Sequence, residues 1–283
     1  MSGPYTAASG AASGVDDVVA VEVTIDGMLV IADALNLVDF PVALAIRPNI
    51  PQLDLRDIVW DQVRRDLTDQ GIFDIYGGVH PDVAAMVDTL SRADRTLEAR
   101  WWRRDVGGKM IRFVVCRKGE RHVIAARDGE MIVLQRIAPQ VGLAGMVNAV
   151  LGSATPANVE PLTGSTDRLA AARDPEQLTQ FGIPLSSARL YADLIANPTS
   201  WVEISAIERH PGGTTTQADV AAGVLDSRLG RIVSLPRRVS GELYGSFLPG
   251  TDENLERALH NLVEFLPSRG WFDVAPADGA EPE

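Results

Sequence analysis

The side chains of this chain that most readily take part in nucleophilic or metal chemistry are four histidines and one cysteine. A zinc site needs nitrogen and sulfur ligands at short, recurring spacings. His80, His122, His210 and His260 do not pair with one another, or with Cys116, at such a spacing. The sequence therefore predicts no metal ligand, no catalytic residue and no cofactor.

The most conspicuous local string is His210-Pro-Gly-Gly-Thr-Thr-Thr. Its glycines are compatible with a loop that cradles an anion through backbone N–H groups. However, no lysine follows them, and no strand-loop-helix order surrounds the string. Proline and glycine are also typical turn residues. The string therefore favours a hairpin connection that enters a threonine-rich strand.

Carboxylates are abundant, with 38 aspartates and glutamates in 283 residues. The catalytic motifs G-x-S-x-G, G-x-G-x-x-G and H-E-x-x-H are absent from the sequence. An acid–base pair of carboxylates needs no such motif, so an enzyme that uses one stays open at this point. On an acidic protein, the default role of these side chains is solubility.

The overall charge limits the class of partner. A net charge of −12 and a pI near 4.8 argue against nucleic acid and anionic membrane, because both are bound through a basic surface. No apolar run reaches the roughly 18 residues of a membrane span, and the N-terminus has no signal-peptide pattern. The lone Cys116 lies in an apolar strand pattern, which indicates a packed thiol and a reducing compartment. We expect a cytoplasmic protein that does not insert into membranes.

Two stretches of the chain, 83–102 and 188–206, read as the same structural unit written twice. Each has an amphipathic helix, a short turn and then a strand that carries tryptophan. The correspondence between the two halves continues downstream, where Gly129-Glu-Met matches Gly241-Glu-Leu and each half ends with another helix. A duplicated half usually gives a quasi-two-fold molecule, because each copy buries its apolar face against the other.

The elements around this repeat predict an α+β fold with a largely antiparallel sheet. We expect an N-terminal half at 17–152 and a C-terminal half at 153–273, which together form one domain, with disordered tails at 1–16 and 274–283. Strands are expected near 95–103, 109–117, 121–126, 131–136, 200–208, 217–226, 230–236 and 242–247, and helices near 54–70, from 81, near 141–150 and near 252–266.

Alternation along the strands separates the two faces of the sheet. Leu97, Ala99 and Trp101 form one apolar face that helices would cover. The other face mixes charged, small and aromatic residues, so we expect it to be open and to bind a partner. Its candidate residues are Glu98, Arg100, Trp102, Glu203, Asp219 and Gly223, with Gly107 and Gly108 in the adjoining loop.

Several short segments of the chain are not specific for a protein family one by one, but their order and spacing together are. They include Val21-Glu-Val-Thr-Ile-Asp, Phe40-Pro, Trp201-Val-Glu-Ile, Thr214-Thr-Thr and Ser246-Phe-Leu-Pro-Gly-Thr. With these segments the chain resembles the EspG family of mycobacterial type VII (ESX) secretion proteins. Trp101-Trp-Arg-Arg-Asp and His210-Pro-Gly-Gly-Thr-Thr-Thr resemble the branch encoded at the first ESX locus.

The resemblance implies a central antiparallel sheet flanked by N- and C-terminal helical bundles, without catalytic residues. It also implies a cytosolic chaperone that binds PE–PPE heterodimers at the tip of the PPE subunit and covers an apolar motif there. The family's contact surface draws on the central sheet, a strand-joining loop and the C-terminal helical bundle. These expectations agree with the candidate residues on the sheet face.

Two alternatives remain open from the sequence. A small-molecule hydrolase or transferase would use an acidic pair on the sheet and would need a deep pocket with perturbed carboxylates. A self-assembling scaffold would pair its exposed sheet edge with a second copy, which also allows a weak homodimer. A chaperone instead needs a broad, shallow face.

Overall fold

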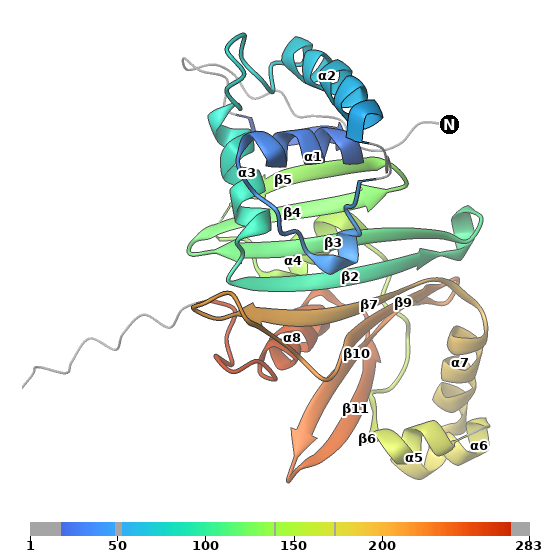
Figure 1. Cartoon of the computed structure of the whole chain (residues 1–283). Coiled ribbons are helices and arrows are strands. Elements are labelled where there is room, and N and C mark those ends of the chain that lie inside the picture. The colour runs from blue at the N-terminus through green and yellow to red at the C-terminus, as the bar shows by residue number, and fades with distance from the viewer. Residues whose placement is uncertain (1–17, 49–52, 139, 173, 273–283) are drawn as a thin grey trace, which may run out of the picture.

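The computed structural model describes residues 18–48, 53–138, 140–172 and 174–272. The predicted tails, 1–16 and 274–283, lie outside the described residues. Within the described ranges the chain forms one antiparallel sheet of eleven strands with helices on both faces (Figure 1). The predicted α+β class is confirmed.

The strands are, in chain order, β1 (Ala20–Thr24), β2 (Arg95–Arg103), β3 (Lys109–Lys118), β4 (Arg121–Asp128), β5 (Met131–Ile137), β6 (Leu162–Ser165), β7 (Pro198–Arg209), β8 (Thr215–Gln217), β9 (Ala222–Ser227), β10 (Gly230–Val239) and β11 (Glu242–Pro249). Outwards from the central pair, one half runs β2-β3-β4-β5-β1 and the other runs β7-β9-β10-β11-β6. This mirrored order confirms the predicted quasi-two-fold arrangement, while the limits of the two halves stay a prediction.

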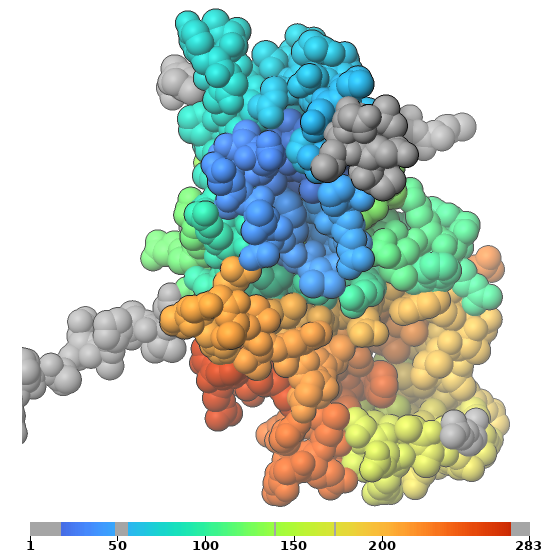
Figure 2. Space-filling view, in the orientation of Figure 1, coloured from blue at the N-terminus to red at the C-terminus, as the bar shows by residue number. Residues whose placement is uncertain are grey.

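The helices are α1 (Ile25–Ala34), α2 (Leu53–Asp69), α3 (Pro81–Ser91), α4 (Leu143–Leu151), α5 (Thr166–Ala171), α6 (Pro175–Leu178), α7 (Leu185–Ala196) and α8 (Asp252–Val263), with short 3₁₀ turns η1 (Val42–Leu44), η2 (Arg104–Val106) and η3 (Thr179–Phe181). Figure 1 shows α1 and α3 in front of the sheet and α4 and α8 behind it. Figure 2 gives the same view with atoms filled, where blue N-terminal helices cover the upper part and the yellow-green α5 lies at the opposite end.

Helices α4 and α8 cover the middle of one face, which we call the α4–α8 face. Leu97, Ala99 and Trp101 of β2 point into this core together with Val202 and Ile204 of β7. All of them are at most 6% exposed. The predicted alternation is therefore confirmed for both strands, because each places every second residue in the same core.

The opposite face is covered at its two ends. α1 and α3 pack there over a core that contains Val114 and Ala125, and α7 packs over a second core that contains Ile232. The prediction that only one face carries helices is wrong. The reason is that β3 is apolar on both sides, since Phe113 packs on the α4–α8 face while Val114 packs on the opposite one. A strand with two apolar faces must be covered twice.

Helix ends follow the expected capping chemistry. His80 is the N-cap of α3, and its Nδ1 accepts a hydrogen bond from the Asp82 N–H at 3.3 Å. The Thr251 hydroxyl caps α8 by accepting from the Asn254 N–H at 3.1 Å. These contacts satisfy backbone donors that the first helical turn leaves free. His80 and Thr251 thus fix the first turns of α3 and α8.

One predicted strand, 217–226, is divided in the structure. β8 pairs with residues 207–209 of β7, and β9 pairs further along the same strand, so both run beside β7. Between them the chain leaves the ladder at 218–221. Ala218 is still buried in the same core as Ala222. The apolar side chains thus keep their packing while the backbone between them bulges outward.

The string at His210 forms the predicted hairpin. The His210 N–H donates to the Thr214 carbonyl at 2.8 Å, and the His210 Nε2 lies 2.7 Å from the Thr216 hydroxyl. Cys116 is fully buried, and burial raises the pKa of its thiol to about 12. Both observations agree with the predicted hairpin and with a packed, unreactive thiol.

Candidate protein-docking surface

The centre of the opposite face is a ladder of side-chain pairs where the two halves meet. β2 and β7 are antiparallel neighbours, so Trp102 faces Trp201 and Arg100 faces Glu203. We call these four residues the seam. They point away from α4 and α8, because their neighbours in sequence fill that core. The seam is therefore built by both halves of the molecule.

An aromatic pair lies at one end of the seam. The ring centroids of Trp102 and Trp201 are 5.8 Å apart with planes inclined by 40°. Trp201 is 41% exposed, whereas Trp101 is buried on the α4–α8 face. The prediction that only one ring of the Trp101–Trp102 dipeptide lies on the open face is confirmed. An aromatic pair of fixed geometry with one exposed ring is a typical anchor for a protein partner.

The loop between β2 and β3 lies against this pair. Gly107 and Gly108 both have left-handed backbones, with φ of 82° and 77°. A Cβ on Gly108 would stand 3.3 Å from the Trp102 ring, whereas one on Gly107 would meet nothing within 4 Å. Glycine at 108 thus lets the loop approach the indole closely. The two predicted loop residues lie where they were expected.

Charges in this loop are paired locally. The Arg103 guanidinium donates to both Asp105 carboxylate oxygens, at 2.8 and 2.7 Å, and also lies over the Trp101 ring at 4.4 Å from its centroid. Hydrogen bonds from Arg103 hold the pKa of Asp105 below its ordinary value. The carboxylate therefore remains charged and orders the turn, rather than standing free for acid–base chemistry.

Glu203 and Gly223 are neighbours on the same face, since they face each other in the β7–β9 ladder. Glu203 is exposed. A Cβ on Gly223 would lie 2.6 Å from the Ser234 hydroxyl, which is too close. Glycine avoids this collision and leaves no side chain beside Glu203. Both residues occupy the positions that strand phase predicts for them.

Glu98 does not lie on an open surface. It shares the face with Arg100, but only 4% of it is exposed. The expectation of an open position is wrong, because the segment around η1 and the end of α3 lie over this part of β2 and form a pocket above Glu98. Alternation gives the face on which a side chain lies, but it does not say what covers that face.

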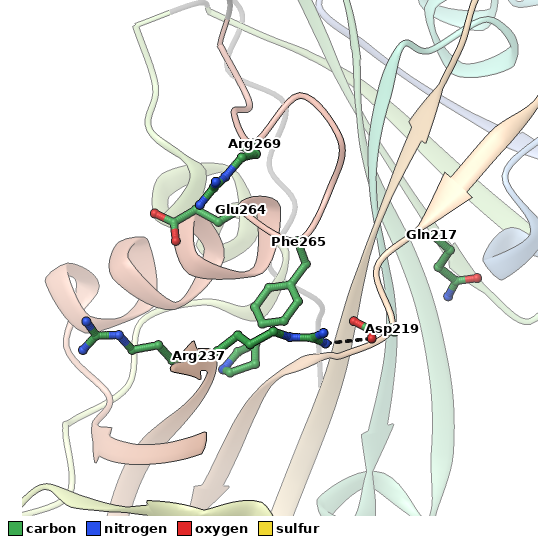
Figure 3. Close-up of a pocket in the computed structure, with 8 residues that line it drawn as sticks. Gln217, Asp219, Arg237, Glu264, Phe265 and Arg269 are labelled. Atoms are coloured by element: carbon green, nitrogen blue, oxygen red, sulfur yellow. Dashed lines mark hydrogen bonds and ion pairs between the residues drawn. The ribbon is translucent and has the colours of Figure 1, made fainter. Parts of the chain in front are cut away.

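Asp219 also departs from its expected position. It stands in the bulge between β8 and β9, and its carboxylate accepts from the Arg238 guanidinium at 2.9 Å. The same guanidinium lies over the Phe265 ring, 5.4 Å from its centroid. Figure 3 shows Asp219 on the Phe265 side of this pocket, whereas Arg237 points away from it. This charged pocket also contains Glu264 and lies apart from the seam residues. Asp219 is therefore not a seam residue.

An apolar groove lies at the C-terminal end of the opposite face and was not singled out from the sequence. It has a volume of about 500 Å³ between α5, α7 and β11. Ile195 of α7 is 54% exposed at its margin. The only sequence signal was a stripe of apolar residues in 185–196, which predicts a packed face but no groove. Its walls include Leu162, Leu169, Leu178, Tyr191, Ile195 and Phe247.

The groove and the seam share one face of the sheet. Trp201 faces Leu225 across the β7–β9 pair, and Leu225 faces Ile232 across the β9–β10 pair. Leu225 and Ile232 belong to the core beneath α7, which also contains Phe247 from the groove wall. The aromatic end of the seam and the apolar groove therefore lie on the same face of the sheet, with the core beneath α7 between them. A face with these two features suits a protein partner that has a protruding apolar end.

Two further properties of the described residues bear on function. They contain no group of three or more His, Cys, Asp and Glu side chains that could hold a metal ion. Among the same residues, no helix has the length and apolar character needed to cross a membrane.

The model of the EspG family matches residues 24–261. The chain belongs to the EspG family. The matched range includes the seam, the apolar groove and nearly all of both halves of the sheet. Membership thus concerns the whole folded body and not a single motif.

Named relatives refine this assignment within the EspG family. The ESX-1 secretion-associated protein EspG1 of Mycolicibacterium smegmatis is 70% identical over 280 residues, which cover 99% of each chain. The protein of the same name from Mycobacterium tuberculosis is 70% identical over 273 residues, 96% of each chain. The ESX-3 secretion-associated protein EspG3 of M. smegmatis is 28% identical over 91% of this chain and 90% of its own length. The predicted likeness to the ESX-1 branch is confirmed.

A solved structure has the same fold. It is the M. tuberculosis type VII secretion system chaperone EspG5 in complex with a PE25–PPE41 dimer. The TM-score is 0.73 over 89% of this chain and 98% of that chain, at 17% sequence identity. At this identity the likeness establishes the architecture alone.

Proposed function

We propose that this EspG-family chain is a chaperone that binds the PPE subunit of a PE–PPE heterodimer and delivers the pair to an ESX secretion system. The proposal is supported by family membership, by the ESX-1 secretion-associated relatives and by the EspG5 complex. The observation that carries it is the apolar groove beside α7, which lies on the same face of the sheet as the exposed Trp201.

The groove suits an apolar tip better than a polar ligand. Its walls are mostly aliphatic and aromatic side chains from α5, α7 and β11. Tyr191 lies at the base with its hydroxyl already bonded to the carbonyls of Glu160 and Phe247, at 2.8 and 3.0 Å. The groove therefore offers few free polar groups, and burial of apolar surface would supply the binding energy.

The action of the chaperone then requires only that it bind the monomeric PPE protein and not its self-associated form. A PPE tip that is apolar enough to self-associate loses that tendency while the groove covers it. Because the chaperone binds the monomeric form, mass action lowers the concentration of the aggregation-prone form. Such a step belongs in the cytoplasm before export, and the single buried Cys116 is compatible with that reducing compartment.

Two structural observations weigh against a scaffold that assembles through its sheet edges. The edge strands β1 and β6 are short, with five and four residues. Short edges leave few unpaired backbone groups for a second copy. An enzyme that uses an acid pair gains no support from the seam either, because Glu203 faces Arg100 there and not a second carboxylate.

Co-purification tests the proposal. The chain is expressed with a PE–PPE pair from the same locus and passed through size exclusion, as wild type and as Ile195→Asp. We expect a ternary complex with wild type and its loss with Ile195→Asp, which puts a charge into the groove. Ile58→Asp is the matched control, because Ile58 is 68% exposed on α2, away from the groove. Equal recovery with all three proteins would contradict the groove assignment.

A further inference from the structure

Glu98 and Glu203 occupy matching positions in the two halves, on β2 and β7, but they have different partners. Glu203 faces Arg100 in the β2–β7 ladder. By the same register Glu98 faces Ser205. In the quasi-two-fold relation Ser205 is therefore the counterpart of Arg100, and a serine stands where symmetry would place an arginine. Glu98 lacks the cation that its counterpart faces.

The side chain of Glu98 is almost completely buried, and its carboxylate opens into a pocket without a partner from the described part of the protein. Glu98 is 4% exposed, and no hydrogen bond or ion pair to it occurs among the residues that the structure describes. Across the ladder, Ser205 is 7% exposed and its hydroxyl is also without a partner in the described part of the chain. A buried charge is costly unless it is paired and hydrogen-bonded.

Glu98 lines a pocket of about 280 Å³. Phe40, Pro41 and Val42 form its apolar wall, with Leu90 from the end of α3 and the hairpin glycine Gly213. The pocket is therefore an amphipathic slot with a carboxylate inside, a shape that suits an alkyl chain ending in a cation.

The other charges of the pocket leave that carboxylate unmatched. Asp39 and Arg209 also line it, and their side chains lie 3.7 Å apart as an ion pair. Together with Glu98 they give two carboxylates and one guanidinium, so the pocket has one net negative charge. A monovalent cation would neutralise it.

We propose that this pocket receives a basic side chain, best an arginine, from the protein that docks on the seam. A guanidinium presents its N–H donors as a planar fork and can bind the Glu98 carboxylate through two parallel hydrogen bonds. The identity of the partner rests on the proposed function, whereas the cation site itself does not. The pocket would fix the register of a partner whose apolar end lies in the groove.

The cation site is tested on the chain alone with agmatine, a four-carbon chain that carries a guanidinium at one end and an ammonium at the other, and binding is monitored by ¹⁵N–¹H NMR. Neutral butylurea is the control ligand. We expect saturable shifts at amides around the pocket with agmatine only. Glu98→Gln keeps the shape and should weaken agmatine binding about tenfold or more, while the exposed Glu203→Gln should leave it unchanged. Absence of saturable shifts, or equal weakening by both variants, overturns the site and indicates a merely hydrated carboxylate.

A second experiment uses the PE–PPE pair with the same variants and tests whether the partner supplies the cation. We expect the bound pair to abolish the agmatine shifts and Glu98→Gln to weaken the pair about tenfold. If the pair binds wild type and Glu98→Gln equally, the assignment of the cation to the partner is wrong. If wild type binds agmatine but no PE–PPE pair, the proposed function fails while the cation site stands.

Discussion

The indole rings of Trp102 and Trp201 lie 5.8 Å apart, although one belongs to the N-terminal half and the other to the C-terminal half. The pair forms only where β2 and β7 join in the sheet. Its exposed member, Trp201, stands between the groove side of the sheet and the charged pair Arg100–Glu203. Docking on this face would therefore depend on the correct assembly of both halves.

Trp201→Ala should weaken binding of the PE–PPE pair by about 2 kcal/mol or more, because large central aromatic side chains dominate interface energies. Isothermal titration calorimetry with the purified pair measures the change. Trp60→Ala on α2 is the matched control, since Trp60 packs beside the N-terminal core and stacks with Arg56 instead. Equal losses with both variants would point to a general effect on folding.

The two loop glycines give a second prediction. Gly107→Ala and Gly108→Ala should each lower the unfolding free energy by about 1 kcal/mol, because both backbones are left-handed. Only Gly108→Ala places a methyl group against the Trp102 ring. We expect it to weaken partner binding more than Gly107→Ala does. Identical binding by the two variants would show that the Trp102 position is not critical.

The contact between α4 and α8 supplies a prediction on stability. The Glu256 carboxylate of α8 accepts hydrogen bonds from the Leu143 and Ala144 N–H groups, at 3.1 and 2.6 Å, and so caps the start of α4. Glu256→Ala should lower the unfolding free energy by about 1–2 kcal/mol in urea titrations. Glu253→Ala, on the exposed first turn of α8, should change it by less than half as much.

The buried pair His122 and Trp271 predicts a pH dependence. The Trp271 indole N–H donates to His122 Nε2 at 3.2 Å, and His122 Nδ1 lies 3.1 Å from the Glu120 carbonyl, so the ring is neutral in this arrangement. Burial lowers the pKa of His122; the nearby Arg117 acts in the same direction and Asp94 opposes it. Since the folded pKa lies below the unfolded value of 6.5, this contribution to stability is present above pH 6.5 and is lost below it.

Urea unfolding at pH 7.5 and pH 5.5 measures this effect. Wild type should lose stability on acidification by up to about 1.4 kcal/mol per pH unit below 6.5 from His122 alone. His122→Asn should be less stable at pH 7.5 but should lose less on acidification. A variant with the full acid sensitivity of wild type would show that other groups cause it.

The sheet could be predicted because its strands follow the period-2 pattern. Alternation alone predicts the correct face for Leu97, Ala99 and Trp101, and the repeated unit predicts the quasi-two-fold arrangement that the mirrored strand order shows. Glu98 and Glu203 have the same local pattern, but they differ in burial because η1 lies over one of them only. The path of that segment depends on tertiary packing, which no local period encodes.

The groove could not be predicted for a similar reason. Its walls come from α5, α7 and β11, so residues such as Leu169 and Phe247 meet only after the second half has folded. Asp219 was misplaced because the backbone bulges between β8 and β9, which breaks the alternation on which its assignment depended.

Hydrogen–deuterium exchange on the chain, alone and bound to a cognate PE–PPE pair, measures which face of the sheet the partner covers. We expect slower exchange on binding in the 104–108 loop and along α7, with unchanged exchange in α8 on the other face of the sheet. Slower exchange confined to α4 and α8, with the loop and α7 unaffected, would contradict this expectation.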